Sequence, residues 1–436
     1  MRQPLMSRGL MNLTLKYFIL TLLAMVVPLL SRASATNSLP QGSHDGADQS
    51  QHSPACWAFG FAYDPDNLNA KVRVRVLSDG REVAQATANG PRQDYSGVCP
   101  GGNCGFEIYL WDRITHGQVH TITVQAQDAQ TRRWVNLSNT PRQLKCFTFE
   151  LKVLNLDKGT VTPIFTGLLD YGFVPSWSPS GDKIAFADWS FSNPQHPVRG
   201  DWTSAGLHVV DLATCQTQIV EGAEDSAPAW SPDGQTIAFA DWSGINLIPA
   251  SGGVRQLLRA GATQPDWSPD GSRIVFYQES DSSVRTIDVS TGAETFVTSF
   301  VAPGPTYNWA YPTWSPDGRG IAFNNDAGDI FKIAVDAQAN PIGMPVHVTA
   351  NPRQEADACW SADSRNLFFH SEVSISADPL SEHFDLWAVS ASGGRPIRLT
   401  DITGQGVNVG CWRKGNRIAY AGINNGSGGE SCRPKR

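Results

Sequence analysis

One short motif recurs through the second half of the chain and restricts its fold more than any other feature. Four strong copies read SWSPSGDKIAF, AWSPDGQTIAF, DWSPDGSRIVF and TWSPDGRGIAF, and two weaker copies read CWSADSRNLFF and CWRKGNRIAY. A repeat of about 40–50 residues that contains strands and turns is typical of a β-propeller. The repeat tryptophans are spaced at nearly this period, and they are Trp177, Trp230, Trp267, Trp314, Trp360 and Trp412.

Each copy has the chemistry of a tight turn between two strands. Ser-Pro-Asp-Gly places Ser, Pro and Gly at the positions that a type I turn favours. The turn would join an inner strand that ends in Trp to a second strand with the pattern Ile-Ala-Phe. Trp and Phe then fill the space between neighbouring blades, so we expect all six repeat tryptophans to belong to the structural core.

Outer hairpins complete the count of strands. A strand pattern with a turn follows each of the first five copies, for example at residues 207–212 and 284–289. The sixth copy has none, whereas residues 151–166 form a hairpin pattern ahead of the first copy. We therefore predict a six-bladed β-propeller in which residues 151–166 complete the last blade. Such closure protects the sheet edges that an open array would expose.

The repeats in residues 149–424 resemble the TolB-like six-bladed β-propeller family. This resemblance implies a periplasmic or secreted protein that serves as a platform for a partner. It specifies the fold more than the activity, because propellers carry many functions. TolB has an α/β domain in front of its propeller, whereas this sequence predicts β-structure there, so no partner residues are carried over.

Residues 1–35 have the three parts of a secretory signal peptide. Arg2, Arg8 and Lys16 accompany the apolar run YFILTLLAMVVPLL, and the A-x-A cleavage signal ASA follows. The alternative is a membrane anchor, but this run is shorter than the ~20 residues that cross a bilayer. We expect cleavage, no transmembrane segment in the mature chain, and a periplasmic or secreted location.

The region between the leader and the repeats divides into two parts. Residues 36–55 are polar and cannot bury a core, so we expect a disordered tether. Residues 56–148 show period-two alternation, for example at Val72, Val74 and Val76, and Asp79-Gly80 suits a hairpin. We predict an immunoglobulin-like β-sandwich, and the strings FGFAYDPDN and NCGF resemble such modules of secreted bacterial proteins. Residues 425–436 form a C-terminal tail.

The chain has eight cysteines, and export favours disulfides over metal thiolates. One pair flanks a four-residue loop, one pair brackets the sandwich module, and one pair precedes the last two repeat tryptophans. The remaining pair lies in the first outer hairpin and the tail. Eight cysteines allow 105 pairings, so the connectivity is a hypothesis: Cys99–Cys104, Cys56–Cys146, Cys359–Cys411 and Cys215–Cys432.

Catalytic motifs are absent from the sequence. Neither G-x-S-x-G nor H-E-x-x-H occurs. His370 and His383 bracket an insertion in the fifth blade and are the candidate metal pair of the alternative function, a glycan-binding or metal-dependent, lyase-like glycan-cleaving protein. Asp64, Asp66 and Asn67 offer oxygen ligands of the kind that calcium prefers, although Asp-Pro-Asp-Asn is also an ordinary turn. We expect no other cofactor.

Candidate partner-binding residues lie outside the repeat core. Two insertions carry aromatic side chains, and acidic residues close to the repeat tryptophans predict a negative rim around the central channel. The net charge of −7 argues against nucleic acid. We therefore predict an exported, non-enzymatic platform for an envelope protein or peptide. Its candidate contacts are Trp189, Trp202, Tyr307, Trp309, Tyr311, Asp225, Asp266 and Asp357.

Overall fold

The computed structural model describes residues 37–49, 56–91, 99, 102–110, 113–115, 118–146, 148–167, 174–191, 202–222, 226–299, 310–325, 328–349, 355–374, 382–400 and 408–424. The expected signal peptide and tail lie outside these ranges. The regular structure within them is β-strand, together with short 3-10 turns such as η3 (Glu279–Asp281). None of the helices in these ranges has the length and apolar character needed to cross a membrane.

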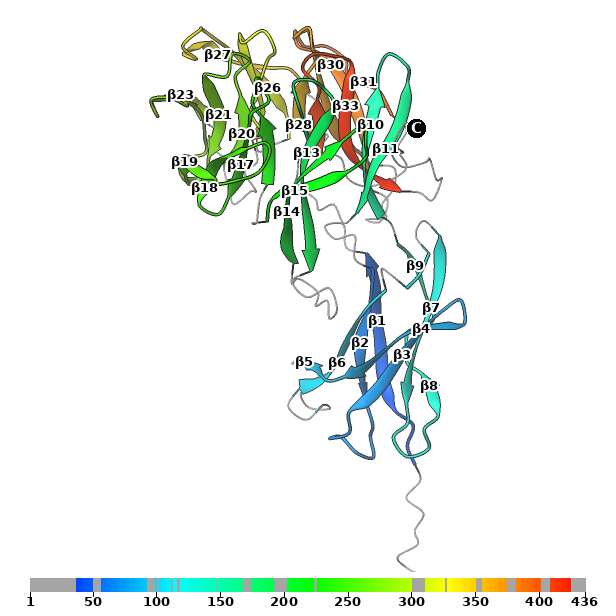
Figure 1. Cartoon of the computed structure of the whole chain (residues 1–436). Helices are drawn as coiled ribbons and strands as arrows, with labels where there is room; N and C mark the ends of the chain where they lie inside the picture. Colours follow the sequence, from blue (N-terminus) through cyan, green and yellow to red (C-terminus); the bar gives the residue numbers. More distant parts are fainter. Residues whose placement is uncertain are drawn as a thin grey trace, which may run out of the picture.

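The first nine strands form two sheets that enclose one apolar core (Figure 1). Alternate residues of β3, including Val72, Val74 and Val76, are fully buried and pack against Ile122 and Val124 of the same sheet and against the facing sheet. One sheet has the order β1 (Gln41–Gln49), β2 (Cys56–Tyr63), β6 (Asn103–Tyr109), β5 (Gly90–Pro91). The other has the order β4 (Arg81–Ala88), β3 (Val72–Ser78), β7 (Val119–Gln127), β8 (Trp134–Asn136), with β9 (Arg142–Lys145) also paired to β7.

Strand β1 lies in the range for which we expected a disordered tether, and that expectation is wrong for residues 41–49. Its backbone pairs with β2 from Gln41 opposite Tyr63 to Gln49 opposite Cys56. The strand reads QGSHDGADQ, so it has no large apolar side chain to reveal it. Backbone pairing holds it, and its His44 is fully buried. Burial, together with the nearby Arg142, lowers the pKa of His44 to about 4.

In the described ranges, the other strands form six four-stranded antiparallel sheets, here numbered I to VI. From the innermost strand outward, sheet I consists of β12 (Ser176–Trp177), β13 (Lys183–Phe191), β14 (Trp202–Asp211) and β15 (Thr217–Glu221). Sheet II consists of β16 (Ser226–Trp230), β17 (Thr236–Asp241), β18 (Gly244–Pro249) and β19 (Gln256–Ala260). Sheet III consists of β20 (Ala262–Trp267), β21 (Arg273–Gln278), β22 (Ser283–Asp288) and β23 (Glu294–Ser299). Sheet IV consists of β24 (Thr313–Trp314), β25 (Gly320–Asn324), β26 (Ile330–Val335) and β27 (Pro341–His347). Sheet V consists of β28 (Glu355–Trp360), β29 (Asn366–Ser374), β30 (Glu382–Ser390) and β31 (Ile397–Arg398). Sheet VI consists of β32 (Val409–Cys411), β33 (Arg417–Asn424), β10 (Thr148–Asn155) and β11 (Thr160–Gly167).

The six sheets close into a ring. Each innermost strand contacts the next, in the cycle β12, β16, β20, β24, β28, β32 and back to β12. Six separate apolar clusters fill the spaces between neighbouring sheets. Sheet VI joins the two ends of this region, because β10 pairs with β33 from Thr148 opposite Asn424 to Asn155 opposite Arg417. The hairpin ahead of the first repeat therefore completes the last sheet, as its place in the sequence predicts.

The repeated turn is built in the same way in sheets II to V, and in sheet I the Ser178 hydroxyl donates to Asp182 instead. In sheet II the Ser231 hydroxyl accepts the Thr236 N–H at 2.9 Å and donates to the Asp233 carboxylate at 2.5 Å. Trp230 then packs with Phe239 between sheets I and II. The tryptophans of these five copies are at most 9% exposed and lie in the clusters between the sheets: Trp177, Trp230, Trp267, Trp314 and Trp360.

The sixth copy is displaced by one residue relative to the others. Cys411 pairs with Ile418, as Trp230 pairs with Ile237. The Trp412 N–H donates to the Arg417 carbonyl at 3.0 Å, which is the bond that a serine N–H makes in sheets I to V. The turn keeps its length, but the tryptophan has moved one place along the chain, so Cys411 stands where the other sheets have Trp and Trp412 stands where they have Ser.

Trp412 therefore differs from the core residue that we expected. It is half-buried and packs against the turn of sheet I. Its ring lies 6.3 Å from that of Trp177, and the Arg417 guanidinium lies 4.1 Å from its centroid. The side chain seals the join between sheets VI and I from outside the regular core position.

Three disulfides join cysteines that we had paired from the sequence: Cys56–Cys146, Cys99–Cys104 and Cys359–Cys411. The first ties the ends of the N-terminal module, and the third joins sheets V and VI. Cys215 is also disulfide-bonded. Its expected partner, Cys432, lies outside the described residues.

Candidate functional site: the central cavity

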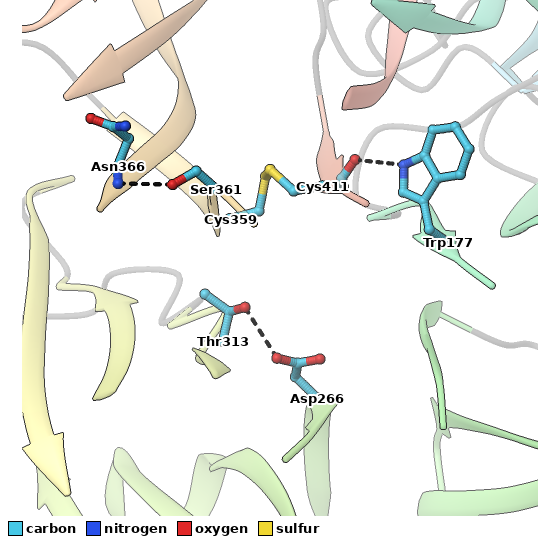
Figure 2. Close-up of a disulfide and its surroundings, with 8 residues drawn as sticks. Trp177, Asp266, Thr313, Cys359, Ser361, Asn366 and Cys411 are labelled. Carbon is cyan, nitrogen blue, oxygen red and sulfur yellow. Dashed lines mark hydrogen bonds between the residues drawn. A yellow bond between two sulfur atoms is a disulfide. The ribbon is translucent and has the colours of Figure 1, made fainter. Parts of the chain in front are cut away.

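A cavity of about 300 Å³ lies at the centre of the ring, lined by the innermost strands of all six sheets. The lining residues come from the same few positions of each copy. We number these positions from the repeat tryptophan, with the tryptophan as position 0 and, in sheet VI, Cys411 as position 0. Figure 2 shows part of this region, with the Cys359–Cys411 disulfide, Asp266, Thr313 and the Trp177 indole drawn as sticks.

Prolines form the cavity wall in sheets I to IV. Each innermost strand is the free edge of its sheet, and a proline there has no N–H to leave unpaired. This part of the wall is rigid and offers few hydrogen-bond donors. The prolines stand at positions −2 and +2, and they are Pro175, Pro179, Pro228, Pro232, Pro265, Pro269, Pro312 and Pro316.

Position −3 is held in an uncommon backbone conformation in four sheets. Ala227, Gln264, Tyr311 and Asp357 have φ values of 48°, 55°, 40° and 53°. Non-glycine residues seldom adopt this left-handed region, and clusters of them mark functional or strained sites. The ladders of sheets II, III and V are interrupted by a bulge beside this residue. All four residues line the cavity.

Arg413 crosses the cavity. It occupies position +2 of sheet VI, where sheets I to IV have proline. Its Nη1 donates to the Trp267 carbonyl at 2.6 Å, and its Nη2 contacts the Asp266 carboxylate. Sheets III and VI stand on opposite sides of the ring, so this one side chain joins opposite walls.

Asp266 is fixed on several sides. Its carboxylate accepts the Trp314 N–H at 2.8 Å and the Thr313 hydroxyl at 3.1 Å, the latter visible in Figure 2. Burial raises its pKa, while Arg413 and these hydrogen bonds oppose the shift. We expected Asp266 on an acidic rim open to a partner, but the structure pairs it with Arg413 within the wall.

Asp357, which also lines the cavity, is likewise paired. It is 3% exposed, and its Oδ2 lies 3.3 Å from Nδ1 of His370. His370 stands opposite Leu386 and His383 stands opposite Val373, so the two histidines are three ladder positions apart. In the described part of the chain, no group of three or more His, Cys, Asp or Glu side chains is arranged to hold a metal ion.

The Cys359–Cys411 disulfide lines the same cavity and joins the innermost strands of sheets V and VI (Figure 2). Both cysteines stand where sheets I to IV have other residues, namely Cys359 at position −1 and Cys411 at position 0. Next to the disulfide, the Trp177 indole donates to the Gly410 carbonyl at 3.0 Å. The covalent bond and this hydrogen bond together hold sheets V, VI and I around the cavity.

The remaining predicted contact residues divide by position. Tyr311 lines the cavity, and its N–H donates to Gln264 Oε1 at 2.7 Å. Trp189 and Trp202 lie in the paired strands β13 and β14, opposite Ser204 and Phe191. Tyr307, Trp309 and Asp225 lie outside the described residues. Sequence reasoning missed Gln264 and Arg413, although the departure of RKG from SPDG was a signal for Arg413.

Comparison with known proteins identifies the fold of the ring. No family model matches the chain. A protein assigned as TolB from Agrobacterium tumefaciens is similar in structure, with a TM-score of 0.50, 21% identity, and coverage of 64% of this chain and 99% of that one. An auxiliary nutrient binding protein from Bacteroides thetaiotaomicron has a TM-score of 0.40, 10% identity and coverage of 88% and 98%. The calcium-binding protein regucalcin from Agrobacterium tumefaciens has a TM-score of 0.40, 15% identity and coverage of 60% and 81%. The first likeness shows that the ring has a TolB-like β-propeller fold.

Proposed function

We propose that this chain is an exported, non-enzymatic binding platform whose six-bladed, TolB-like propeller engages a protein or peptide of the cell envelope. One observation carries the proposal: the framework of the ring repeats, whereas position −3 at the cavity does not. The strained residues there differ in size and polarity, since they are Ala227, Gln264, Tyr311 and Asp357. Residues that have a strained backbone and side chains that do not repeat are expected at a recognition surface carried by a repeating framework.

The chemistry of the wall suits a peptide. The prolines of sheets I to IV give the cavity an apolar lining, and a polypeptide brings apolar side chains that can pack against it. Gln264 adds a side-chain amide to the same cavity wall. The disulfides and the signal peptide predicted for residues 1–35 support a periplasmic or secreted location. The two-sheet N-terminal module is, in this proposal, an immunoglobulin-like spacer.

Site-specific photo-crosslinking from the cavity tests the proposal. A photoreactive residue in place of Gln264 should capture a discrete envelope protein from detergent-solubilised extract. The same residue in place of Thr291, which is exposed in the turn between β22 and β23, is the matched control and should capture nothing. Asp357→Asn should weaken the capture from position 264, because it changes the wall without filling the cavity.

Two outcomes would contradict the proposal. Equal capture from positions 264 and 291 would mean that the cavity is not the binding surface. Retention of polysaccharide alone would favour the glycan-binding alternative, and a metal-dependent cleavage lost in His370→Ala would then assign an enzymatic function.

A further inference from the structure

The copies of the repeat differ in charge where they meet the cavity. At position +3, the turns of sheets II to V carry an aspartate that accepts a hydrogen bond from the serine of the turn, as Asp233 does from Ser231. The turn of sheet VI carries Lys414 there, directly after Arg413 at position +2. Both of these residues line the cavity. The sixth sheet therefore brings two adjacent positive charges to positions that are neutral or acidic in the other five.

The two aspartates that line the cavity leave part of this positive charge available. Asp266 contacts Arg413, and Asp357 lies against His370. Lys414 is exposed and forms no ion pair within the described residues. Arg413 has five N–H donors, of which its contacts with the described residues use two, and its side chain is 29% exposed. The remaining donors of Arg413 and the Lys414 ammonium can therefore meet an anionic group.

Gln264 adds a buried donor without a partner to the cavity wall. Its Oε1 accepts the main-chain N–H of Tyr311 at 2.7 Å. A main-chain N–H can only donate, so the atom that receives it must be the amide oxygen, and the orientation of the amide is fixed. The Gln264 side chain then presents a buried Nε2 that donates to no described residue, and Gln264 is only 3% exposed. An unused buried donor is costly, and a ligand oxygen would satisfy it.

The Gln264 amide and the Arg413 guanidinium lie along the same strand of sheet III. Arg413 meets β20 at Asp266, and Gln264 stands two residues before Asp266 in that strand. Two residues of a strand span about 6–7 Å. The side chains of Gln264 and Asp266 both reach the main chain of sheet IV, at Tyr311 and at Trp314. The amide and the guanidinium are thus grouped on one side of the cavity, where sheets III and IV meet.

Grouped N–H donors beside positive charge are suited to a carboxylate, since hydrogen bonds between arginine and a carboxylate are strong and directional. We propose that the cavity recognises a carboxylate of the envelope protein or peptide, with Arg413 and Gln264 as its contacts and Lys414 as an added charge. The carboxylate belongs to a C-terminus or to an acidic side chain. Asp357 stands two sheets further around the ring, and its buried Oδ1, which has no partner in the described part of the chain, suits an N–H of the ligand. This inference rests on the function proposed above, because it names the group that the platform recognises.

Selection from two synthetic peptide libraries, with the full chain as the receptor, tests the proposal. Both libraries contain the same random heptapeptides, but one ends in free carboxylates and the other in amides. We expect the selected peptides to come from the free-acid library or to contain aspartate or glutamate. Amidation of the C-terminus, and replacement of each acidic side chain by its amide, then identify which carboxylate is recognised. Its loss should weaken binding about tenfold, as measured by fluorescence anisotropy.

Variants of the chain give a second readout with the selected peptide. Gln264→Glu should weaken binding about tenfold, because it exchanges the donor for a negative charge while an oxygen can still accept the Tyr311 N–H. Loss of the amide alone, as in the crosslinking variant at this position, should weaken binding only about threefold. Lys414→Gln should also weaken binding about threefold. Lys158→Gln is the matched control, because it removes another exposed charge from the turn between β10 and β11, and it should change nothing.

The outcomes separate this inference from the proposed function. Equal enrichment of both libraries, without acidic side chains, would overturn the inference and leave the peptide-binding function standing. Enrichment from neither library would overturn both. If Gln264→Glu does not fold, the exposed Lys414 carries the comparison, and unchanged binding in Lys414→Gln would then overturn the inference.

Discussion

Sheets I to IV and sheets V and VI build the same cavity in two different ways. The first four sheets repeat one solution, with a tryptophan between the sheets, a serine-capped turn and prolines at positions −2 and +2. The last two sheets replace those prolines with Ala358, Ala362, Val409 and Arg413, and they add the Cys359–Cys411 disulfide. We call these two parts the regular arc and the irregular arc.

The difference shows where repetition is needed and where it is relaxed. The regular arc gains rigidity from proline, which limits the backbone and removes edge donors. The irregular arc lacks the proline rigidity and the removal of edge donors, and its sixth tryptophan stands one residue later than in the other copies. A disulfide and a charged side chain hold this arc instead. Arg413 anchors this arc to Asp266 of the regular arc.

The largest expected effect separates the two kinds of tryptophan. Trp230→Ala should lower the free energy of unfolding by about 3–5 kcal/mol, because it empties a packed site between two sheets. Trp412→Ala should cost about 1–2 kcal/mol, since that ring is half-buried. Denaturant unfolding of both variants measures the contrast. Equal losses would show that Trp412 is a core residue after all.

Removal of the Cys359–Cys411 disulfide should have the next largest effect. The double variant Cys359→Ser and Cys411→Ser opens a loop with a sequence separation of 52 residues, and we expect a loss of about 2–4 kcal/mol. The matched control removes Cys99–Cys104, whose separation is only 5 residues, and should cost less. If the control variant loses more stability, the irregular arc does not depend on its covalent bond.

The bond between the arcs can be measured with a double-mutant cycle. Arg413→Leu and Asp266→Asn should each destabilise the propeller, and their coupling free energy should be about 1–2 kcal/mol, since the pair is partly exposed. Equilibrium unfolding of the four proteins gives this value. A coupling near zero would mean that the two side chains act separately and that Arg413 does not join the arcs.

The smallest effect should be equal in both arcs. Ser361→Ala in sheet V and Ser231→Ala in sheet II each remove a hydroxyl that accepts a backbone N–H at 2.9 Å. We expect about 1 kcal/mol for each substitution. Thermal melting of the two variants side by side checks this equality. A much smaller loss for Ser361→Ala would place the irregularity in the turns as well as in the wall.

The sequence predicts the framework well because the framework is local. The SPDG turn, the Ile-Ala-Phe strand and the outer hairpins depend on residues close in the chain, and the repeats report them several times. The hairpin at residues 151–166 could be assigned to the last sheet because only that copy lacked one. The pairs Cys56–Cys146 and Cys359–Cys411 followed from their places within the units.

The candidate site was less predictable because it depends on a one-residue shift within the sixth copy and on contacts between residues that are far apart in the sequence. In the sixth copy the tryptophan stands one residue later than in the others, at the serine position of the turn, so Trp412 leaves the core position and Arg413 stands in the wall. The left-handed conformation at Ala227 and Gln264 has no sequence signature, since neither residue is glycine. Strand β1 is held by backbone pairing, which hydrophobic patterning does not detect.

The pairing of β10 with β33 also sets an order of events during synthesis. Leu151 is made early, and its partner Ala421 is made only after the other five sheets. Until then the first hairpin has no neighbour on that side, and the ring stays open. The cavity thus exists only in a chain whose last strand has arrived, and a contact of such long range slows folding. A partner that recognises the cavity would consequently distinguish finished molecules from fragments.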